Sequence, residues 1–272
     1  MIQLPNLTLL KTAQDKLDSW QNEINSIVDY ADRVKQAKTS FARYNKSNNS
    51  TFREVRQVLT KMCCGCRRCG YCEDSVADEV EHIKPKDIYP EAVFLWENYL
   101  YACGQCNSPK NNKYAVFSYA TGQLTEVSRK RSDPVIEPEA GDPVLINPRI
   151  EDPLKFLEID LIDTFYFLPS HSPDSRNYQR AYYTINVLRL NDRDYLVEAR
   201  EEAFKNYQAR LEQYITQKQA GATPDQLNHL ISAIQRMQHP TVWKEMQRQQ
   251  HFIRHLNHLK KLFDLAPEAL TW

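Results

Sequence analysis

Hydrophobic residues recur every three or four positions from residue 8 to residue 37, with charged and polar residues between them. This spacing predicts one long amphipathic helix with a buried apolar face. The polar stretch Tyr44–Ser50 interrupts the pattern as a turn does. A second helix is expected from Thr51 to about Met62, because Thr51 and Glu54 have the spacing of a capping box.

Helical periodicity stops at residue 63 and returns near residue 176. Between Ser118 and Asp174 the chain carries seven prolines, which exclude long helices there. Two apolar runs, 155–161 and 164–169, are separated by a short connection that contains Asp163. This pattern predicts a β-hairpin.

The C-terminal third is predicted to be helical. Two helices are expected over about 176–188 and 193–218. The next helix has a capping-box pair in Thr223 and Gln226, with Pro224 at its first position.

Pro240 separates that helix from a last one, predicted over about 241–264. His251, His255 and His258 fall at i, i+4 and i+7 within it, a spacing that could bind a metal. We interpret the three histidines as one ordinary helical face, because such spacing more often marks a helix side than a metal site.

Together these patterns predict the α+β fold class, with a small mixed centre between helical ends. Four regions are expected: an N-terminal helical segment (1–60), a cysteine-containing core (61–117), a proline-rich extended segment with a hairpin (118–174) and a C-terminal helical region (175–272).

Composition and charge narrow the class of protein. The chain has 272 residues, 42% of them hydrophobic and 26% charged, which is typical of a folded water-soluble protein. The sequence has no apolar run of about 20 residues and no basic, apolar leader at its start, so we expect a cytoplasmic protein with no membrane partner. The net charge is zero, and residues 115–175 carry 5 basic against 11 acidic side chains. Nucleic-acid binding therefore has to be argued from a site rather than from overall charge.

All seven cysteines lie between residues 63 and 106, and four of them form two C-x2-C pairs: Cys69 with Cys72 and Cys103 with Cys106. Two such pairs supply four thiolates in the tetrahedral arrangement that a structural zinc ion prefers. Unrelated buried cysteines are the alternative, and the two identical spacings argue against it.

The other three cysteines leave open which thiols bind the metal, because Cys63 with Cys66 and Cys66 with Cys69 also have the C-x2-C spacing. A second metal is one interpretation. We favour the other, that Cys63, Cys64 and Cys66 are thiols beside the site without a metal of their own.

Glu81 and His82 lie between the two cysteine pairs, in the run E-H-I-x-P-K. Asn98 lies between the same two pairs, closer to the second. Asn107 and Lys110 follow the second pair in the run C-N-x-x-K. This combination resembles the zinc-stapled HNH endonucleases of the ββα-metal type. The resemblance implies a core of two strands and a helix tied together by zinc, because so small a unit has too little core of its own.

The resemblance also implies the chemistry of the site. His82 is the expected general base for the attacking water, and Asn98 is expected to fix the loop that orients it. Glu81 and Asn107 are the expected ligands of one divalent cation, Mg²⁺ with Mn²⁺ as an alternative. Asn107 stands where many relatives have His, which gives a neutral and weaker ligand. Contacts to nucleic-acid phosphates are expected from three lysines: Lys84, Lys110 and Lys113.

The similarity extends beyond the core, through Val144–Pro148, Glu151–Pro153, Thr184–Asn191 and Arg200. These runs resemble the PtuB-type HNH proteins, nuclease partners of PtuA-type ATPases in Septu and retron-associated antiphage systems. We interpret the proline-containing stretch within this region, from Leu145, as an extended segment that wraps the nuclease core.

This resemblance implies a metal-dependent DNA endonuclease that acts in phage defence with an ATPase. The helical ends, 1–50 and 206–272, would dock the ATPase or complete the core. Two alternatives stay open from the sequence: the same nuclease acting on RNA such as tRNA, and a non-catalytic zinc adaptor for the ATPase. The adaptor is disfavoured because Glu81, His82, Asn98 and Asn107 are all present.

Overall fold

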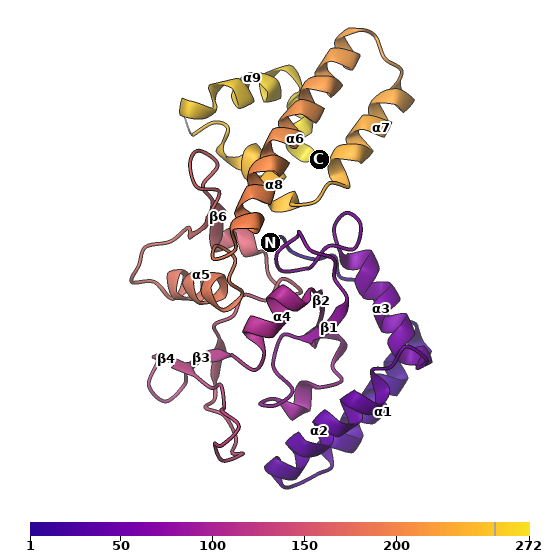
Figure 1. Ribbon diagram of the computed structural model, residues 1–272, viewed down its shortest axis with the longest axis vertical. Helices are drawn as coiled ribbons and strands as arrows, with labels where there is room; N and C mark the ends of the chain where they lie inside the picture. The colour runs from indigo at the N-terminus through magenta and orange to yellow at the C-terminus, as the bar shows by residue number, and fades with distance from the viewer. Residues whose placement is uncertain (253) are drawn as a thin grey trace.

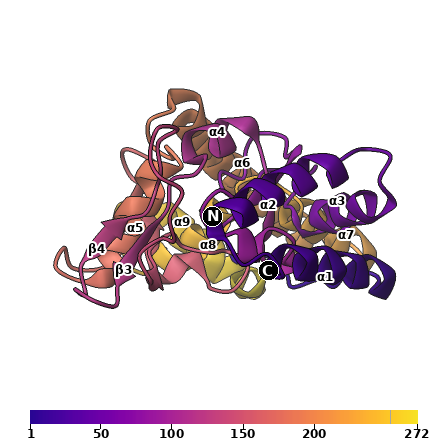
Figure 2. The same cartoon turned by 90° about the horizontal axis from the view of Figure 1, so that it is seen from below.

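The computed structural model describes residues 1–252 and 254–272. A small α/β centre lies between three N-terminal helices, a strand-rich arm and a C-terminal helical lobe (Figure 1). The N-terminal helices and the strand-rich arm lie at opposite ends of the molecule when it is seen from below (Figure 2). In the described part of the chain no helix is both long and apolar enough to cross a membrane.

The N-terminal region contains helices α1 (Lys11–Asn25) and α2 (Tyr30–Tyr44). The prediction of a single helix over 8–37 is therefore wrong. The chain breaks between them because the Asp29 side chain accepts a hydrogen bond from the Asp32 backbone N–H and starts a new helix. The apolar stripe continues across the break, so periodicity alone does not reveal it.

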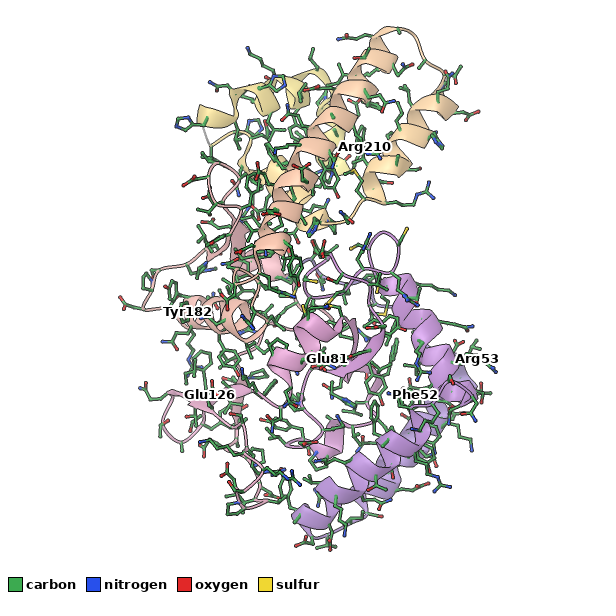
Figure 3. All side chains as sticks on the ribbon, in the orientation of Figure 1. Phe52, Arg53, Glu81, Glu126, Tyr182 and Arg210 are labelled. Carbon is green, nitrogen blue, oxygen red and sulfur yellow. The ribbon has the colours of Figure 1, made fainter. Side chains whose placement is uncertain are left out.

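Helix α3 (Ser50–Met62) matches the second predicted helix in extent, but its cap differs. The N-cap is Asn49, whose side chain accepts from the Phe52 backbone N–H at 3.1 Å, so Thr51 is not the capping residue. Phe52 is fully buried (Figure 3), and α3 packs on α1 and on the central strand β2 (Tyr99–Ala102).

The centre is a two-stranded antiparallel sheet followed by a helix. Strand β1 (Glu79–His82) pairs with β2 in the register Glu79 to Ala102 and His82 to Tyr99. The connection contains two short 3-10 turns, η1 (Pro90–Ala92) and η2 (Trp96–Asn98), and the helix that follows β2 is α4 (Gly104–Lys110). This ββα order inside helical ends confirms the predicted fold class.

The strand-rich arm holds two further sheets. In the first, β3 (Ala115–Ser118) pairs with both β4 (Leu124–Glu126) and β5 (Gly141–Pro143), a sheet that the sequence patterns did not indicate. In the second, β6 (Leu157–Ile159) pairs antiparallel with β7 (Phe167–Pro169), which confirms the predicted hairpin.

A segment of the arm wraps the centre, as interpreted from its prolines. Arg149 is buried, and its guanidinium donates to the carbonyl oxygens of Tyr99 (2.6 Å) and Trp96 (3.2 Å) while lying over the Trp96 ring. The Leu4 backbone N–H donates to the Pro148 carbonyl at 2.8 Å. The segment therefore ties the N-terminus to the end of the β1–β2 connection. A 3-10 turn, η3 (Pro153–Lys155), follows it.

The C-terminal region begins with two helices at the predicted places and a third with the predicted capping box at Thr223. The elements are α5 (Arg176–Val187), α6 (Asp194–Gln219), α7 (Pro224–Gln235), α8 (Pro240–Gln249), η4 (Arg254–Leu256), α9 (Asn257–Leu265) and η5 (Pro267–Thr271).

The single last helix predicted over 241–264 is wrong, because α8 ends at Gln249 and α9 begins at Asn257. Residue 253, inside that range, lies outside the described residues. The three histidines therefore do not share one helical face. His258 instead lies with its Nε2 2.9 Å from Glu212 Oε1 on α6.

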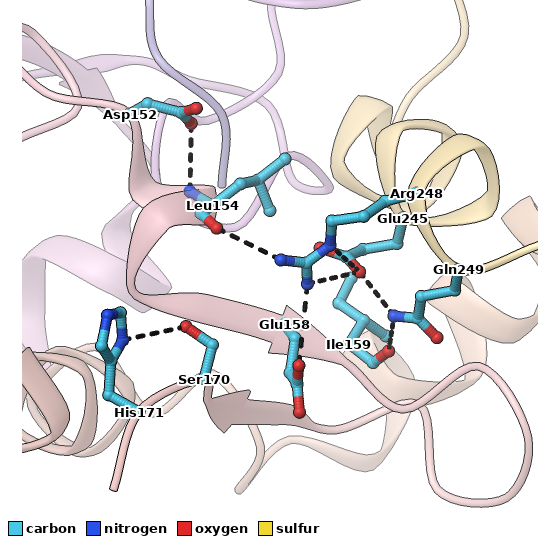
Figure 4. A network of polar contacts seen from close by, with 9 residues as sticks. All are labelled: Asp152, Leu154, Glu158, Ile159, Ser170, His171, Glu245, Arg248 and Gln249. Atoms are coloured by element: carbon cyan, nitrogen blue, oxygen red, sulfur yellow. Dashed lines mark hydrogen bonds and ion pairs between the residues drawn. The ribbon is translucent and has the colours of Figure 1, made fainter. Parts of the chain in front are cut away.

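The C-terminal lobe is joined to the β6–β7 hairpin by a polar network (Figure 4). Gln249 Nε2 on α8 donates to the Ile159 carbonyl at 2.7 Å. Arg248 pairs with the fully buried Glu245 at 2.8 Å and donates to the Leu154 carbonyl at 3.4 Å. These bonds fix α8 against the hairpin.

Candidate active site and metal centre

The four cysteines of the two C-x2-C pairs meet in space. Their Sγ atoms all lie within 4.8 Å of one another, and all four residues are buried. The Sγ atoms of Cys72 and Cys103 are 3.8 Å apart. Zinc–thiolate bonds of about 2.3 Å in a tetrahedron place sulfur atoms about 3.8 Å apart, so the cluster fits a zinc ion.

The cluster connects the turn before β1 to the start of α4, where Cys103 is the N-cap. Four thiolates buried this close together repel one another and lose their hydration, so they need a cation to balance their charge. Arg193, directly before α6, adds a donor, with its Nη2 3.4 Å from Cys106 Sγ.

The remaining cysteines do not join a metal group. Among the described residues, the four cysteines above make the one cluster of three or more side chains that could hold a metal ion. Burial raises the pKa of the Cys63 thiol to about 12, which keeps it protonated and a poor ligand. These observations favour the interpretation of Cys63, Cys64 and Cys66 as thiols without a second metal.

A polar cleft of about 370 Å³ opens between β1 and α4, and Glu81, His82 and Asn107 all line it. Glu81 lies at the centre of the lower half of the molecule, beside α4 (Figure 3). Three of the four predicted catalytic residues thus share one cleft, while Asn98 lies in the connection behind it.

His82 is buried, and its ring packs edge-on against Phe41 and Tyr99 at centroid distances of 4.4 and 5.2 Å. Its Nε2 lies 2.9 Å from the Val93 carbonyl oxygen. A carbonyl only accepts hydrogen bonds, so Nε2 carries the proton and Nδ1 is the proton acceptor of the ring. Burial, with Lys86 nearby, holds the pKa of His82 well below its usual range, so the imidazole is neutral at pH 7.

Asn98 holds the two ends of the β1–β2 connection together. Its Nδ2 donates to the carbonyl oxygens of Lys84 (3.0 Å) and Ala92 (2.8 Å), and its Oδ1 accepts from the Lys84 backbone N–H at 2.7 Å. The same connection carries Val93, whose carbonyl contacts His82. Asn98 therefore fixes the backbone on which the His82 ring rests.

Glu81 is paired with Lys110, a fully buried lysine whose Nζ lies 2.5 Å from Glu81 Oε1. Lys110 Nζ also donates to the His82 carbonyl at 2.8 Å. Burial raises the pKa of Glu81, and the Lys110 ammonium opposes that rise. Lys110 thus joins α4 to β1 beneath the cleft.

The prediction that Lys110 contacts phosphates is therefore wrong, because its ammonium is enclosed and committed to Glu81 and His82. Lys84 and Lys113 are exposed, but they line other hollows of the surface and not the cleft of His82. Their expected contacts to phosphates stay a prediction, for phosphates that flank the cleft.

Asn107 sits one turn into α4, where its backbone N–H donates to the Cys103 carbonyl at 2.9 Å. Its side-chain Nδ2 donates to the Glu79 carboxylate, which leaves Oδ1 as the acceptor of the amide. The cysteine cluster therefore sets the position of Asn107 relative to β1.

Lys86 also lines the cleft, although the sequence motifs do not single it out. After Pro85 the chain turns, with the backbone N–H groups of Ile88 and Tyr89 donating to the Pro85 carbonyl. The ammonium of Lys86 lies 5.4 Å from the centre of the Phe41 ring. The proline directly before Lys86 was the available signal that the strand ends and the chain turns there.

Comparison with known proteins agrees with this geometry. Residues 66–113 match the profile of the HNH endonuclease family. The chain is also 36% identical over 81 residues to a protein of Bacillus thuringiensis described as Septu protein PtuB, a match over 28% of this chain and 26% of that protein. The chain thus spans about a quarter of the length of that relative. Residues 66–113 therefore constitute an HNH endonuclease domain, in a chain that is similar over 81 residues to a Septu protein PtuB.

Proposed function

We propose that this protein is a metal-dependent endonuclease that hydrolyses phosphodiester bonds of DNA in antiphage defence, together with an ATPase. One observation carries the proposal: a neutral, buried His82 lies in the same cleft as the oxygen donors of Glu81 and Asn107, inside an HNH domain. The similarity to a Septu protein supports the role in defence.

His82 is the general base in this proposal. Its Nε2–H is held by the Val93 carbonyl, so Nδ1 accepts the proton of the attacking water. Asn98 keeps the supporting loop in place, which maintains the ring in one orientation. A positioned base of this kind contributes on the order of 10²–10⁴-fold to a rate.

Glu81 and Asn107 would hold the divalent cation through a carboxylate and an amide oxygen. Two oxygen donors and a polar cleft fit Mg²⁺, with Mn²⁺ as an alternative. When bound, such a cation neutralises the charge that develops on the scissile phosphate and the departing oxygen.

The four-cysteine cluster would hold a structural zinc ion. The strands of the centre have four residues each and α4 has seven, too few to form a stable core alone. Zinc would hold α4, and hence Asn107, against β1.

We also propose a PtuA-type ATPase as the partner and the cytoplasm as the place of action. Exposed apolar side chains on the helical ends, at Val28, Phe252 and Leu265, support docking there. Replacing Phe252 and Leu265 by serine is expected to reduce co-purification with the ATPase and to leave the zinc content unchanged.

The substrate is tested by incubating the purified protein, alone and with a PtuA-type ATPase, with plasmid DNA and with tRNA in Mg²⁺. The proposal predicts cleavage of DNA by the wild type and none by the His82→Ala variant. Cleavage of tRNA alone would replace DNA by RNA as the substrate. No cleavage of either, with zinc bound and the ATPase present, would make the protein an adaptor.

A further inference from the structure

The irregular segment between β4 and β5 crosses the rim of the cleft that contains His82. The Arg129 guanidinium donates to the Asp87 carbonyl, and Asn112 Nδ2 donates to the Arg129 carbonyl at 2.8 Å. Asp87 and Asn112 both line the cleft, one on the loop after β1 and the other after α4. Residue 129 is therefore bound to both sides of the rim.

This segment concentrates positive charge in an otherwise acidic region. Arg129, Lys130 and Arg131 are consecutive and hold three of the five basic residues in 115–175. Lys130 and Arg131 are exposed, and Arg129 is half-buried. Lys86, which lines the cleft, adds a fourth positive charge.

Three acidic neighbours contact groups other than the side chains of Lys130 and Arg131. Asp133 accepts a hydrogen bond from the Lys130 backbone N–H at 2.7 Å, and Glu126 accepts from the Ser128 hydroxyl at 3.0 Å. The carboxylate of Asp87 is paired with Lys38 at 3.0 Å.

The turn is ordered by its own hydrogen bonds. Besides the bond from Lys130 to the Asp133 carboxylate, the Asp133 backbone N–H donates to the Lys130 carbonyl at 3.1 Å. Pro134 follows directly and restricts the backbone at the end of the turn. A turn ordered before binding loses less entropy when it engages a ligand.

We infer that the basic rim, defined as Arg129, Lys130 and Arg131, binds the phosphates of the nucleic acid that enters the cleft. The inference rests on the proposed nuclease function and provides phosphate contacts that the buried Lys110 does not. Arginine and lysine on an exposed turn recognise phosphate charge and not base edges, so the rim holds DNA without sequence preference. It supplies local positive charge in a chain whose net charge is zero.

The test measures DNA binding in a cleavage-deficient background, the zinc-loaded His82→Ala protein, by fluorescence anisotropy with a labelled duplex at several salt concentrations. In this background the rim is changed by Lys130→Gln with Arg131→Gln, which leaves the anchoring Arg129 intact. The matched control is Lys16→Gln with Lys261→Gln, an equal loss of charge at exposed positions outside the cleft.

The rim variant is expected to bind DNA roughly tenfold more weakly and to reduce the slope of log affinity against log salt by about 1.8, since each phosphate contact contributes about 0.9. The control is expected to keep both values. Equal affinities for the rim variant and the control, or an unchanged salt slope, would overturn the inference.

Cleavage by the wild type separates this inference from the proposed function. Normal plasmid cleavage together with normal binding by the rim variant would overturn the rim and keep the nuclease. Absence of cleavage and of DNA binding in all forms would overturn both. If the rim variant binds DNA normally but no longer co-purifies with the ATPase, the rim is a surface for an acidic protein partner and the inference is wrong.

Discussion

Lys110 and Glu81 form an ion pair at 2.5 Å in the interior of the HNH domain, with the lysine side chain fully enclosed. The lysine comes from the last turn of α4 and the glutamate from β1, so the pair joins the two elements that carry the candidate site. The same ammonium also binds the His82 carbonyl. The position of β1 relative to α4 therefore depends on this contact.

Lys110→Met is expected to lower the free energy of unfolding by about 3–5 kcal/mol, because it leaves the buried Glu81 carboxylate without its partner. Urea denaturation measures the loss. The double variant Lys110→Met with Glu81→Gln is expected to recover a large part of it, since neither buried charge then remains. A single variant as stable as the wild type would show that the pair does not support the fold.

Asn98→Ala is expected to reduce the rate of DNA cleavage about 10–100-fold, the effect that loss of an outer supporting hydrogen bond has at comparable sites. The loop between β1 and β2 loses three hydrogen bonds, so the Val93 carbonyl no longer fixes His82. The effect is expected in kcat and not in KM, because Asn98 does not line the cleft. A change confined to KM would contradict this role.

Removal of the catalytic cation and loss of the structural zinc ion are expected to have different effects on the protein. EDTA should stop cleavage reversibly, and added Mg²⁺ alone should restore it, because the oxygen ligands bind a cation weakly enough to exchange. Cys72→Ser is expected to lose the zinc ion, to lower Tm and to abolish cleavage that Mg²⁺ cannot restore. Zinc content by mass spectrometry and thermal unfolding check this. A Cys72→Ser protein with full zinc content and activity would contradict the four-cysteine site.

Glu245 provides a test of the junction between α8 and the β6–β7 hairpin. Burial raises the pKa of its carboxyl. The folded state therefore binds this proton more tightly than the unfolded chain, and the stabilisation is present below about pH 4.3 and is lost as pH rises through the folded pKa. The glutamine of Glu245→Gln does not titrate and so does not cause this loss. The Tm of the variant should therefore rise relative to that of the wild type as the pH increases from about 4 to about 7. The exposed Glu198→Gln control should show no such trend; equal trends would contradict the assignment.

The sequence predicted the centre of the molecule well because its signals are local. The spacing of the cysteines requires the turn before β1 and the start of α4 to meet, and the pattern around Asp163 predicts the hairpin. Thr223 and Gln226 specify the start of α7 through bonds between residues three apart.

The features that were missed depend on distant partners. The buried state of Lys110 follows from Glu81, which is far away in the sequence, and lysine by itself indicates a surface position. The rim position of Arg129 follows from its bond to Asp87, which no periodicity encodes. The break before α2 depends on one cap, Asp29, inside a continuous apolar stripe.

The central claim is that His82 is the base of a nuclease site, and plasmid cleavage in Mg²⁺ by three proteins tests it most directly. These are the wild type, His82→Ala and the exposed-histidine control His229→Ala, compared at equal zinc content and Tm. The account predicts that the wild type and His229→Ala cleave alike and that His82→Ala loses at least about 10²-fold in rate. Cleavage by His82→Ala at the rate of the wild type would contradict it.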